Sequence, residues 1–272
     1  MLIEKLRRLW TDRDTALCIG LDPEPARFPQ AVRRGPTEIL DFNKAIIDAT
    51  ADLVCAFKPQ IAYYAAHSAE EQLLATIEYI RERYPHLVVI LDAKRGDIGP
   101  TAEMYARECF DRYGADAVTV NPYMGRDAVA PFLARTDKGV ILLCRTSNPG
   151  ARDFQDLLID GTPLYLRVAE EAVRSWNTNN NLWFVAGASY AAELRELRAI
   201  AGDVPFLIPG VGAQGASVSD AVIAGRDDAG AGIVVSASRA VLYASTGADF
   251  AQAARRVAEE LRREINRART AR

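Results

Sequence analysis

The 272-residue chain has few cysteines and histidines, which limits the chemistry that it can support. Its 4 cysteines are widely spaced and form no C-x-x-C pair, so a zinc site or a dithiol redox centre is not expected. Cys18, Cys55 and Cys144 lie in apolar runs, where a free cysteine usually packs as a small hydrophobic residue. The 2 histidines, His67 and His86, have no convincing partner for a metal site or a Ser-His-Asp triad.

The sequence also lacks a long hydrophobic run and an excess of charge of one sign. No apolar stretch approaches the roughly 18 residues that a membrane-spanning helix needs. The first residues, MLIEKLRRLWTDRD, are too charged for the apolar core of a signal peptide. The net charge is −3, with 33 basic and 36 acidic side chains mixed along the chain, which argues against a nucleic-acid-binding surface. We therefore expect a cytoplasmic protein with no membrane or nucleic-acid partner.

Short apolar runs recur along the chain, and a helical pattern follows each of them. The runs are nearly continuous in Val, Ile, Leu and Ala, as in parallel strands that are covered on both faces. The predicted strands are Ala16–Leu21, Leu53–Lys58, Leu87–Lys94, Ala117–Asn121, Gly139–Cys144, Leu182–Ala186, Pro205–Pro209 and Gly232–Ser236. Apolar stripes predict helices over Thr101–Tyr113 and from about Ala248, and a short amphipathic helix over Ile3–Trp10 precedes the first strand.

This alternation predicts an α/β protein, a (β/α)8 TIM barrel with a short N-terminal helix. Eight β–α units over slightly more than about 250 residues match that fold in size and order. A doubly wound sheet is the alternative, but it usually carries a glycine-rich first turn. The first strand ends instead in Gly20-Leu21-Asp22-Pro23. No internal boundary is visible, so we expect a single barrel domain over residues 1–272.

Charged residues stand at the ends of three consecutive predicted strands. The first strand ends in Asp22, the second in Lys58, and the third in a run from Asp92 to Asp97 that includes Lys94. Active sites of such barrels form at the C-terminal ends of the strands. Asp92 and Lys94 should point the same way, because side chains alternate along a strand. We expect these residues to form one cluster in which opposite charges keep each other ionised.

Each of these residues also has a purely structural interpretation. Asp97 would cap the following helix. Lys58 would reach solvent from its strand end, and Asp92 with Lys94 would form an ion pair at the barrel rim. Their arrival together at the mouth of one barrel favours a catalytic cluster.

The later loops predict a phosphate site. The seventh strand opens into the glycine-rich run Pro209–Gly215, and Ser238 and Arg239 follow the eighth. Glycines let backbone N–H groups approach phosphate oxygens, and arginine adds a bidentate contact. The fifth strand is followed by Ser147, in a loop whose hydroxyl and amide groups suit a polar heterocycle. The sequence therefore predicts a phosphate monoester as substrate.

These motifs together resemble orotidine 5′-phosphate decarboxylase. The run Asp92–Ile98 is similar to the D-x-K-x-x-D-I signature of that family, and the likeness extends through Phe57–Gln60, Ser147–Gly150, Pro209–Gly215 and Ser238-Arg239. The D-x-K-x-x-D piece alone is shared with sugar-phosphate decarboxylases and synthases on the same barrel. The chain length and the T-S-N-P-G form resemble the long bacterial (type 2) branch.

The resemblance implies cofactor-free decarboxylation of orotidine 5′-phosphate to uridine 5′-phosphate, the last step of pyrimidine nucleotide synthesis, without a metal. It implies that Lys94 protonates C6, that Asp92 lies beside the departing carboxylate, and that Lys58 holds the charge network and the ribose. It also implies a homodimer in which Asp97 and Thr101 reach the neighbouring subunit's site. The implied substrate-binding residues are Asp22 for a ribose hydroxyl, Ser147 for the pyrimidine, Gln214 and Arg239 for the phosphate, and Pro209 and Ser238 as further contacts. Asn148 stands where the family often has histidine, so no role is carried onto it.

Three other functions fit parts of the same pattern. A metal-dependent sugar-phosphate decarboxylase or synthase would use Asp92 as a magnesium ligand, but the second strand offers Lys58 rather than a further carboxylate. A Schiff-base aldolase would use Lys94 as nucleophile, but neighbouring carboxylates favour the charged, non-nucleophilic form of a lysine. A non-catalytic barrel that binds phosphorylated metabolites would tolerate the loss of Lys94.

Overall fold

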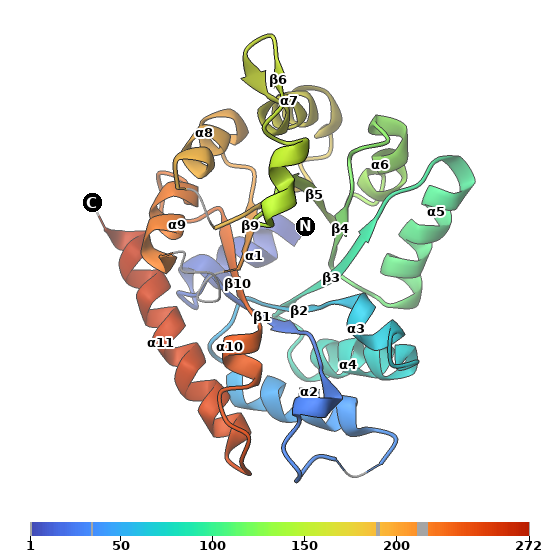
Figure 1. Ribbon diagram of the computed structural model, residues 1–272, viewed down its shortest axis with the longest axis vertical. Coiled ribbons are helices and arrows are strands. Elements are labelled where there is room, and N and C mark those ends of the chain that lie inside the picture. Colours follow the sequence, from blue (N-terminus) through green and yellow to red (C-terminus); the bar gives the residue numbers. More distant parts are fainter. Residues whose placement is uncertain (1, 34, 189–190, 211–216, 272) are drawn as a thin grey trace.

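The computed structural model describes residues 2–33, 35–188, 191–210 and 217–271 (Figure 1). In this part of the chain, eight parallel strands close into a barrel in the order β1-β10-β9-β8-β5-β4-β3-β2. The strands are β1 Leu17–Leu21, β2 Ala56–Pro59, β3 Val88–Arg95, β4 Ala117–Val120, β5 Gly139–Arg145, β8 Leu182–Ala186, β9 Phe206–Pro209 and β10 Ile233–Ala237. Each overlaps its predicted run, and the predicted (β/α)8 fold is confirmed.

Helices surround the strands and cover the outside of the barrel (Figure 1). Their apolar faces pack on strands that are buried almost throughout. The helices are α1 Leu2–Thr11, α2 Glu38–Thr50, α3 Ile61–Ala65, α4 Glu70–Arg83, α5 Gly99–Arg107, α6 Arg126–Leu133, α7 Leu164–Glu171, α8 Ala191–Ala201, α9 Val218–Gly225, α10 Arg239–Leu242 and α11 Phe250–Thr270. The predicted helix Thr101–Tyr113 begins two residues earlier, with Pro100 in its first turn, and continues past α5 as a π-helical turn over Glu108–Arg112.

The predicted N-terminal helix is α1, and it packs against the amino-terminal end of the barrel. Leu2, Leu6 and Leu9 are buried on one face of it. The Trp10 indole N–H donates to the Ile233 carbonyl at the start of β10, over 2.8 Å. Barrels of this fold carry their binding sites at the opposite end of the strands.

A two-stranded hairpin interrupts the β–α alternation after β5. It pairs β6 Leu158–Ile159 with β7 Thr162–Pro163 in antiparallel fashion. Its turn residues, Asp160 and Gly161, both have positive φ, at 49° and 79°, which is the backbone of a tight Asp-Gly hairpin turn. The hairpin was not predicted, because two-residue strands are too short to show a periodic pattern.

Two features of composition have structural counterparts. All four cysteines, Cys18, Cys55, Cys109 and Cys144, are free and buried, in agreement with their structural interpretation. Along the described ranges, none of the helices combines the length and the apolar character that crossing a bilayer requires.

Candidate active site

The carboxyl ends of β2 and β3 bring three predicted residues into direct contact. The Lys58 ammonium lies 3.1 Å from Oδ2 of Asp92, and the Lys94 ammonium lies 2.7 Å from Oδ1 of the same carboxylate. The side chains of Lys58 and Asp92 are buried, with 7% and 11% of their surface exposed, whereas 49% of the Lys94 side chain is exposed. One buried carboxylate is therefore shared by two ammonium groups, one on a buried side chain and one on a half-exposed side chain.

The strand leaves regular geometry where it carries these residues. The register of β3 against β4 shifts between Leu91 and Arg95, as in a β-bulge. Lys94 has φ +48°, in the left-handed region that a residue with a side chain rarely adopts. Such conformations persist only where surrounding contacts impose them, and they concentrate at functional sites.

Thr119 of β4 lies beside this cluster and was not predicted from the sequence. Its hydroxyl donates to Oδ1 of Asp92 over 2.8 Å and accepts from the backbone N–H groups of Ala93 and Lys94 at 3.0 and 2.9 Å. The residue is 1% exposed. The signal that would have indicated it is a lone hydroxyl inside the apolar run of β4, which must find partners when it is buried.

The charges of the cluster stabilise each other. Burial alone would raise the pKa of Asp92, but the Lys58 and Lys94 ammonium groups lower it below the usual range of a carboxyl. Burial alone would lower the pKa of Lys58, but Asp92 and Asp22 raise it above the usual value of a lysine. Asp92 and Lys58 are therefore both charged at neutral pH.

Asp97 and Thr101 lie apart from this cluster. Oδ1 of Asp97 accepts from the N–H of Ile98 at 2.8 Å, and the carboxylate makes no ion pair with any residue that the structure describes. Ile98 is the N-cap of α5, and no described side chain caps that helix, so the alternative role of Asp97 as a helix cap is not observed. Thr101 is exposed in the first turn of α5.

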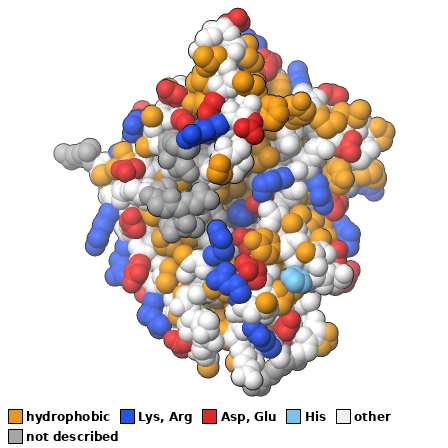
Figure 2. Space-filling view, in the orientation of Figure 1, with side chains coloured by type: hydrophobic (Ala, Val, Ile, Leu, Met, Phe, Trp, Pro, Cys, Tyr) orange, Lys and Arg blue, Asp and Glu red, His pale blue; other side chains and the backbone are white. Residues whose placement is uncertain are grey.

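Several predicted binding residues line one pocket of about 330 Å³ at the barrel mouth. They are Asp22, Lys58, Pro209, Ser238 and Arg239, with Tyr63, Gly210, Ser236 and Ala240 between them. Figure 2 shows basic side chains near the centre of this face, beside acidic ones. Oδ1 of Asp22 is buried and has no hydrogen-bond partner among the described residues, so it is available to a ligand. Gln214 lies outside the described residues.

Close packing of backbone brings the remaining loops to the pocket. A Cβ at Gly20 of β1 would lie 1.9 Å from the Ser238 hydroxyl, so only glycine allows this approach. A Cβ at Gly210, where φ is +87°, would lie 3.6 Å from the Ser147 hydroxyl. The loop after β5 therefore lies against the loop after β9, beside the pocket.

The buried guanidinium of Arg145, directly before the loop that carries Ser147, bonds residues at the end of that loop and on α8. Its role was not predicted from the sequence. Arg145, the last residue of β5, is 3% exposed and pairs with Glu193 of α8 over 3.1 Å and with Asp156 over 2.8 Å. The Gln155 side chain accepts from the backbone N–H of Thr146 at 2.9 Å. These contacts fasten both ends of the segment over residues 146–156 to the barrel.

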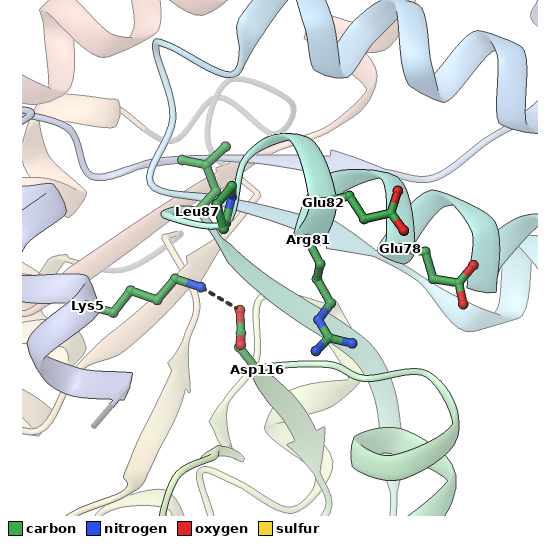
Figure 3. A pocket seen from close by; sticks show the side chains of 7 residues that line it. Lys5, Glu78, Arg81, Glu82, Leu87 and Asp116 are labelled. Carbon is green, nitrogen blue, oxygen red and sulfur yellow. Dashed lines mark hydrogen bonds and ion pairs between the residues drawn. The ribbon is translucent and has the colours of Figure 1, made fainter.

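A second, larger pocket of about 540 Å³ lies at the opposite end of the strands, among Lys5, Glu78, Arg81, Glu82, Pro85, Leu87 and Asp116 (Figure 3). Leu87 and Asp116 directly precede β3 and β4, so this pocket is at the amino-terminal end. Lys5 and Asp116 form an ion pair of 3.1 Å within it. Barrels of this fold place their chemistry at the carboxyl ends, which assigns the active site to the smaller pocket.

The donor set at the mouth suits an anionic ligand rather than a cation. Two ammonium groups flank the Asp92 carboxylate, and Arg239 and Asp22 add one positive and one negative charge, so the site has three cationic and two anionic groups. Over the described ranges, no three side chains of His, Cys, Asp or Glu are grouped so that they could hold a metal ion. Fold and site together define a TIM-barrel enzyme with a cationic site for a small anionic substrate.

Comparison with known proteins identifies the family. The model of the orotidine 5′-phosphate decarboxylase / HUMPS family matches residues 15–257, and the chain belongs to this family. It is 58% identical over 265 residues to the orotidine 5′-phosphate decarboxylase of Janthinobacterium sp. (strain Marseille), covering 97% of this chain and 98% of that protein. Identity to the enzyme of the same name from Cellvibrio japonicus (strain Ueda107) is 57% over 269 residues, covering 98% of each. The family and the carboxy-lyase class predicted from the motifs are confirmed.

Solved structures support the same assignment. The structure of Leishmania donovani OMP decarboxylase superimposes with a TM-score of 0.83 at 34% identity, covering 98% of this chain and 99% of that one. A Toxoplasma gondii structure described as a putative orotidine-monophosphate-decarboxylase gives 0.83 at 35% identity, with 97% and 98% covered.

Proposed function

We propose that this protein decarboxylates orotidine 5′-phosphate to uridine 5′-phosphate and CO₂, the last step of pyrimidine nucleotide synthesis, without metal or cofactor. The observation that carries the proposal is the Asp92 carboxylate held between the Lys58 and Lys94 ammonium groups at the barrel mouth. The near-full-length identity to relatives with that name supports the choice of substrate.

The chemistry needs a cation next to C6. When the bond from C6 to the carboxylate breaks, its electron pair stays on C6, and the pyrimidine ring delocalises that charge poorly. A fixed ammonium beside C6 stabilises the developing anion and then donates a proton to it. Lys94 suits both tasks, because its amine is anchored on Asp92 while 49% of its side chain is exposed.

Asp92 and Lys58 act together on the substrate carboxylate. An ionised Asp92 beside the departing group adds a repulsion that disappears as CO₂ leaves. Lys58, buried on the other oxygen of Asp92, keeps that carboxylate charged. The ion pair with Asp92 also holds the Lys94 ammonium in one position.

The other predicted binding residues are assigned to the parts of the substrate that do not react. Asp22 offers its unpartnered carboxylate oxygen to a ribose hydroxyl, and Ser147 binds the pyrimidine. Gln214 and Arg239 bind the phosphate, with Pro209 and Ser238 as further contacts. Binding energy from this end of the nucleotide orients C6 against Lys94.

The test of the function is turnover of orotidine 5′-phosphate by metal-free protein. The ultraviolet absorbance of the substrate is expected to fall at the same rate with and without excess chelator. An unchanged absorbance with folded protein would refute the proposed reaction. Activity that disappears with chelator and returns with magnesium would favour the metal-dependent sugar-phosphate class instead.

We further propose a homodimer in which Asp97 and Thr101 contribute to the partner's site. Asp97 lies outside its own chain's cluster, as described above. Large apolar side chains are exposed around the same loops, at 52% for Ile98, 51% for Met104 and 85% for Tyr123. Apolar side chains gather over α5 and α6 in Figure 2, and such patches usually mark a surface that another protein covers.

Mixing two inactive variants is expected to restore activity if the site is shared. Lys94→Ala and Asp97→Asn should each be nearly inactive alone. In randomly mixed dimers about half are hybrids, and each hybrid holds one intact site, so about a quarter of the wild-type activity should return. Turnover after co-refolding measures this. A mixture no more active than its two components would contradict the shared site.

A further inference from the structure

Thr119 is the residue outside the proposed machinery that contacts it most directly. Its hydroxyl has one donor and two acceptor positions, and all three are used at the cluster. The donor bonds Asp92, and the acceptors receive the N–H groups of Ala93 and Lys94. A buried hydroxyl thus connects the shared carboxylate to the backbone of the lysine beside it.

These contacts lie where β3 and β4 stop pairing regularly. Leu91 is in register with Val118, but the next paired residue of β3 is Arg95, opposite Val120. The N–H groups of Ala93 and Lys94 fall within this interruption, and they bond the Thr119 hydroxyl in place of a strand carbonyl. Beyond it, the Asn121 N–H donates to the Arg95 carbonyl over 2.7 Å, where the two strands end.

Lys94 lies within this interruption, so its backbone departs from the extended conformation of the strand. The positive φ of Lys94 is disfavoured for a residue with a Cβ, so it needs contacts that hold it. The Lys94 amine then returns to Oδ1 of Asp92, the same oxygen that accepts from Thr119. Thr119 therefore bonds the backbone of the lysine directly and shares with the lysine amine the same oxygen of Asp92.

We infer that Thr119 is a positioning residue for the reaction: its hydroxyl maintains the bulge that aims the Lys94 amine at the reacting carbon. The inference rests on the proposed function. Thr119 itself is 1% exposed and is not among the residues that line the pocket at the barrel mouth. Its loss should therefore affect the chemical step more than the binding of the nucleotide, which depends on other strands.

The test compares Thr119→Val, which has the same shape without the hydroxyl, with Thr119→Ser, which keeps it. The valine variant is expected to lose about 10- to 100-fold in kcat, as misplacement of a reacting group by about 1 Å can do. KM should change less than about threefold, because phosphate and ribose contacts are retained. The serine variant should recover most of the lost kcat.

Thr15→Val is the matched control. Thr15 is fully buried and lies two residues before β1, at the amino-terminal end of that strand. Its hydroxyl donates to the Leu53 carbonyl over 2.6 Å and accepts from the Leu17 N–H at 3.3 Å. The same chemical change there should leave kcat unchanged. If the valine variant at 119 does not fold, comparison of Thr119→Ala with Thr119→Ser isolates the hydroxyl in the same way.

Two kinds of result, one kinetic and one structural, would overturn the inference. One is a folded Thr119→Val enzyme with kcat within about twofold of wild type, or a serine variant as impaired as the valine one. The other is a crystal structure of Thr119→Val in which Lys94 keeps its positive φ and its contact with Asp92. That second measurement needs no activity, so it is independent of whether the wild-type protein turns over orotidine 5′-phosphate.

Discussion

Replacing Lys94 by alanine is expected to lower kcat by at least about 10⁴-fold, because one side chain supplies two effects. A positioned proton donor contributes roughly 10²–10⁴-fold, and removal of one preorganised charge from a developing anion costs roughly 10²–10³-fold. Affinity for uridine 5′-phosphate should change little, since the product carries only a hydrogen at C6. Absorbance assays and calorimetry of product binding measure the two quantities.

The control is Lys44→Ala, which removes a lysine from the outer helix α2 and should retain full activity. The prediction separates an enzyme from a barrel that only binds phosphorylated metabolites. Such a binding protein would tolerate the loss of Lys94 in every assay. A Lys94→Ala protein that still turns over the substrate at more than about a hundredth of the wild-type rate would show that another group protonates C6.

The strands and the charged run could be predicted because both depend on local sequence. Apolar runs such as Leu182–Ala186 are continuous and short, which limits them to buried parallel strands. A charge that directly follows such a run, as Lys58 does, must find a partner or a ligand at the end of the strand. The partner itself then follows from the fold, since β2 and β3 are neighbours in the barrel.

Thr119 and Arg145 could not be predicted in the same way, because their roles depend on contacts between strands. Thr119 bonds Asp92 across 27 positions of sequence, and Arg145 bonds Glu193 across 48. Regular alternation along β3 would also place the Lys94 backbone in extended geometry. The bulge that changes it arises from pairing with β4, which no periodicity within β3 indicates.

Replacing Lys58 by methionine is expected to destabilise the protein as well as inactivate it. Lys58 and Asp92 are a buried ion pair, and removal of one partner leaves the other charge only partly compensated. The free energy of unfolding at pH 7 should fall by about 3 kcal/mol, as measured by urea denaturation. In the control Lys5→Met, the lost pair is partly exposed, so the change should stay below about 1 kcal/mol.

The loss should depend on pH in a defined direction. Because the pKa of Asp92 is lowered in the folded protein, its stabilisation is present above the unfolded value of about 4 and is lost as the pH falls towards the folded value. The pKa of Lys58 is raised, so its contribution is present below the unfolded value of about 10.4 and is lost at higher pH. The difference between wild type and Lys58→Met should therefore be constant from about pH 6 to 9 and shrink below about pH 4.

A double variant decides whether the pair is present for stability or for catalysis. Buried ion pairs replaced on both sides by apolar residues often regain stability, because no unpaired charge remains. Lys58→Met with Asp92→Leu should thus unfold at a higher urea concentration than Lys58→Met alone and still be inactive, since Lys94 has lost its anchor. A double variant as unstable as the single one would indicate that the pair stabilises the barrel. Recovery of stability without activity would mean that these two buried charges are maintained for the reaction.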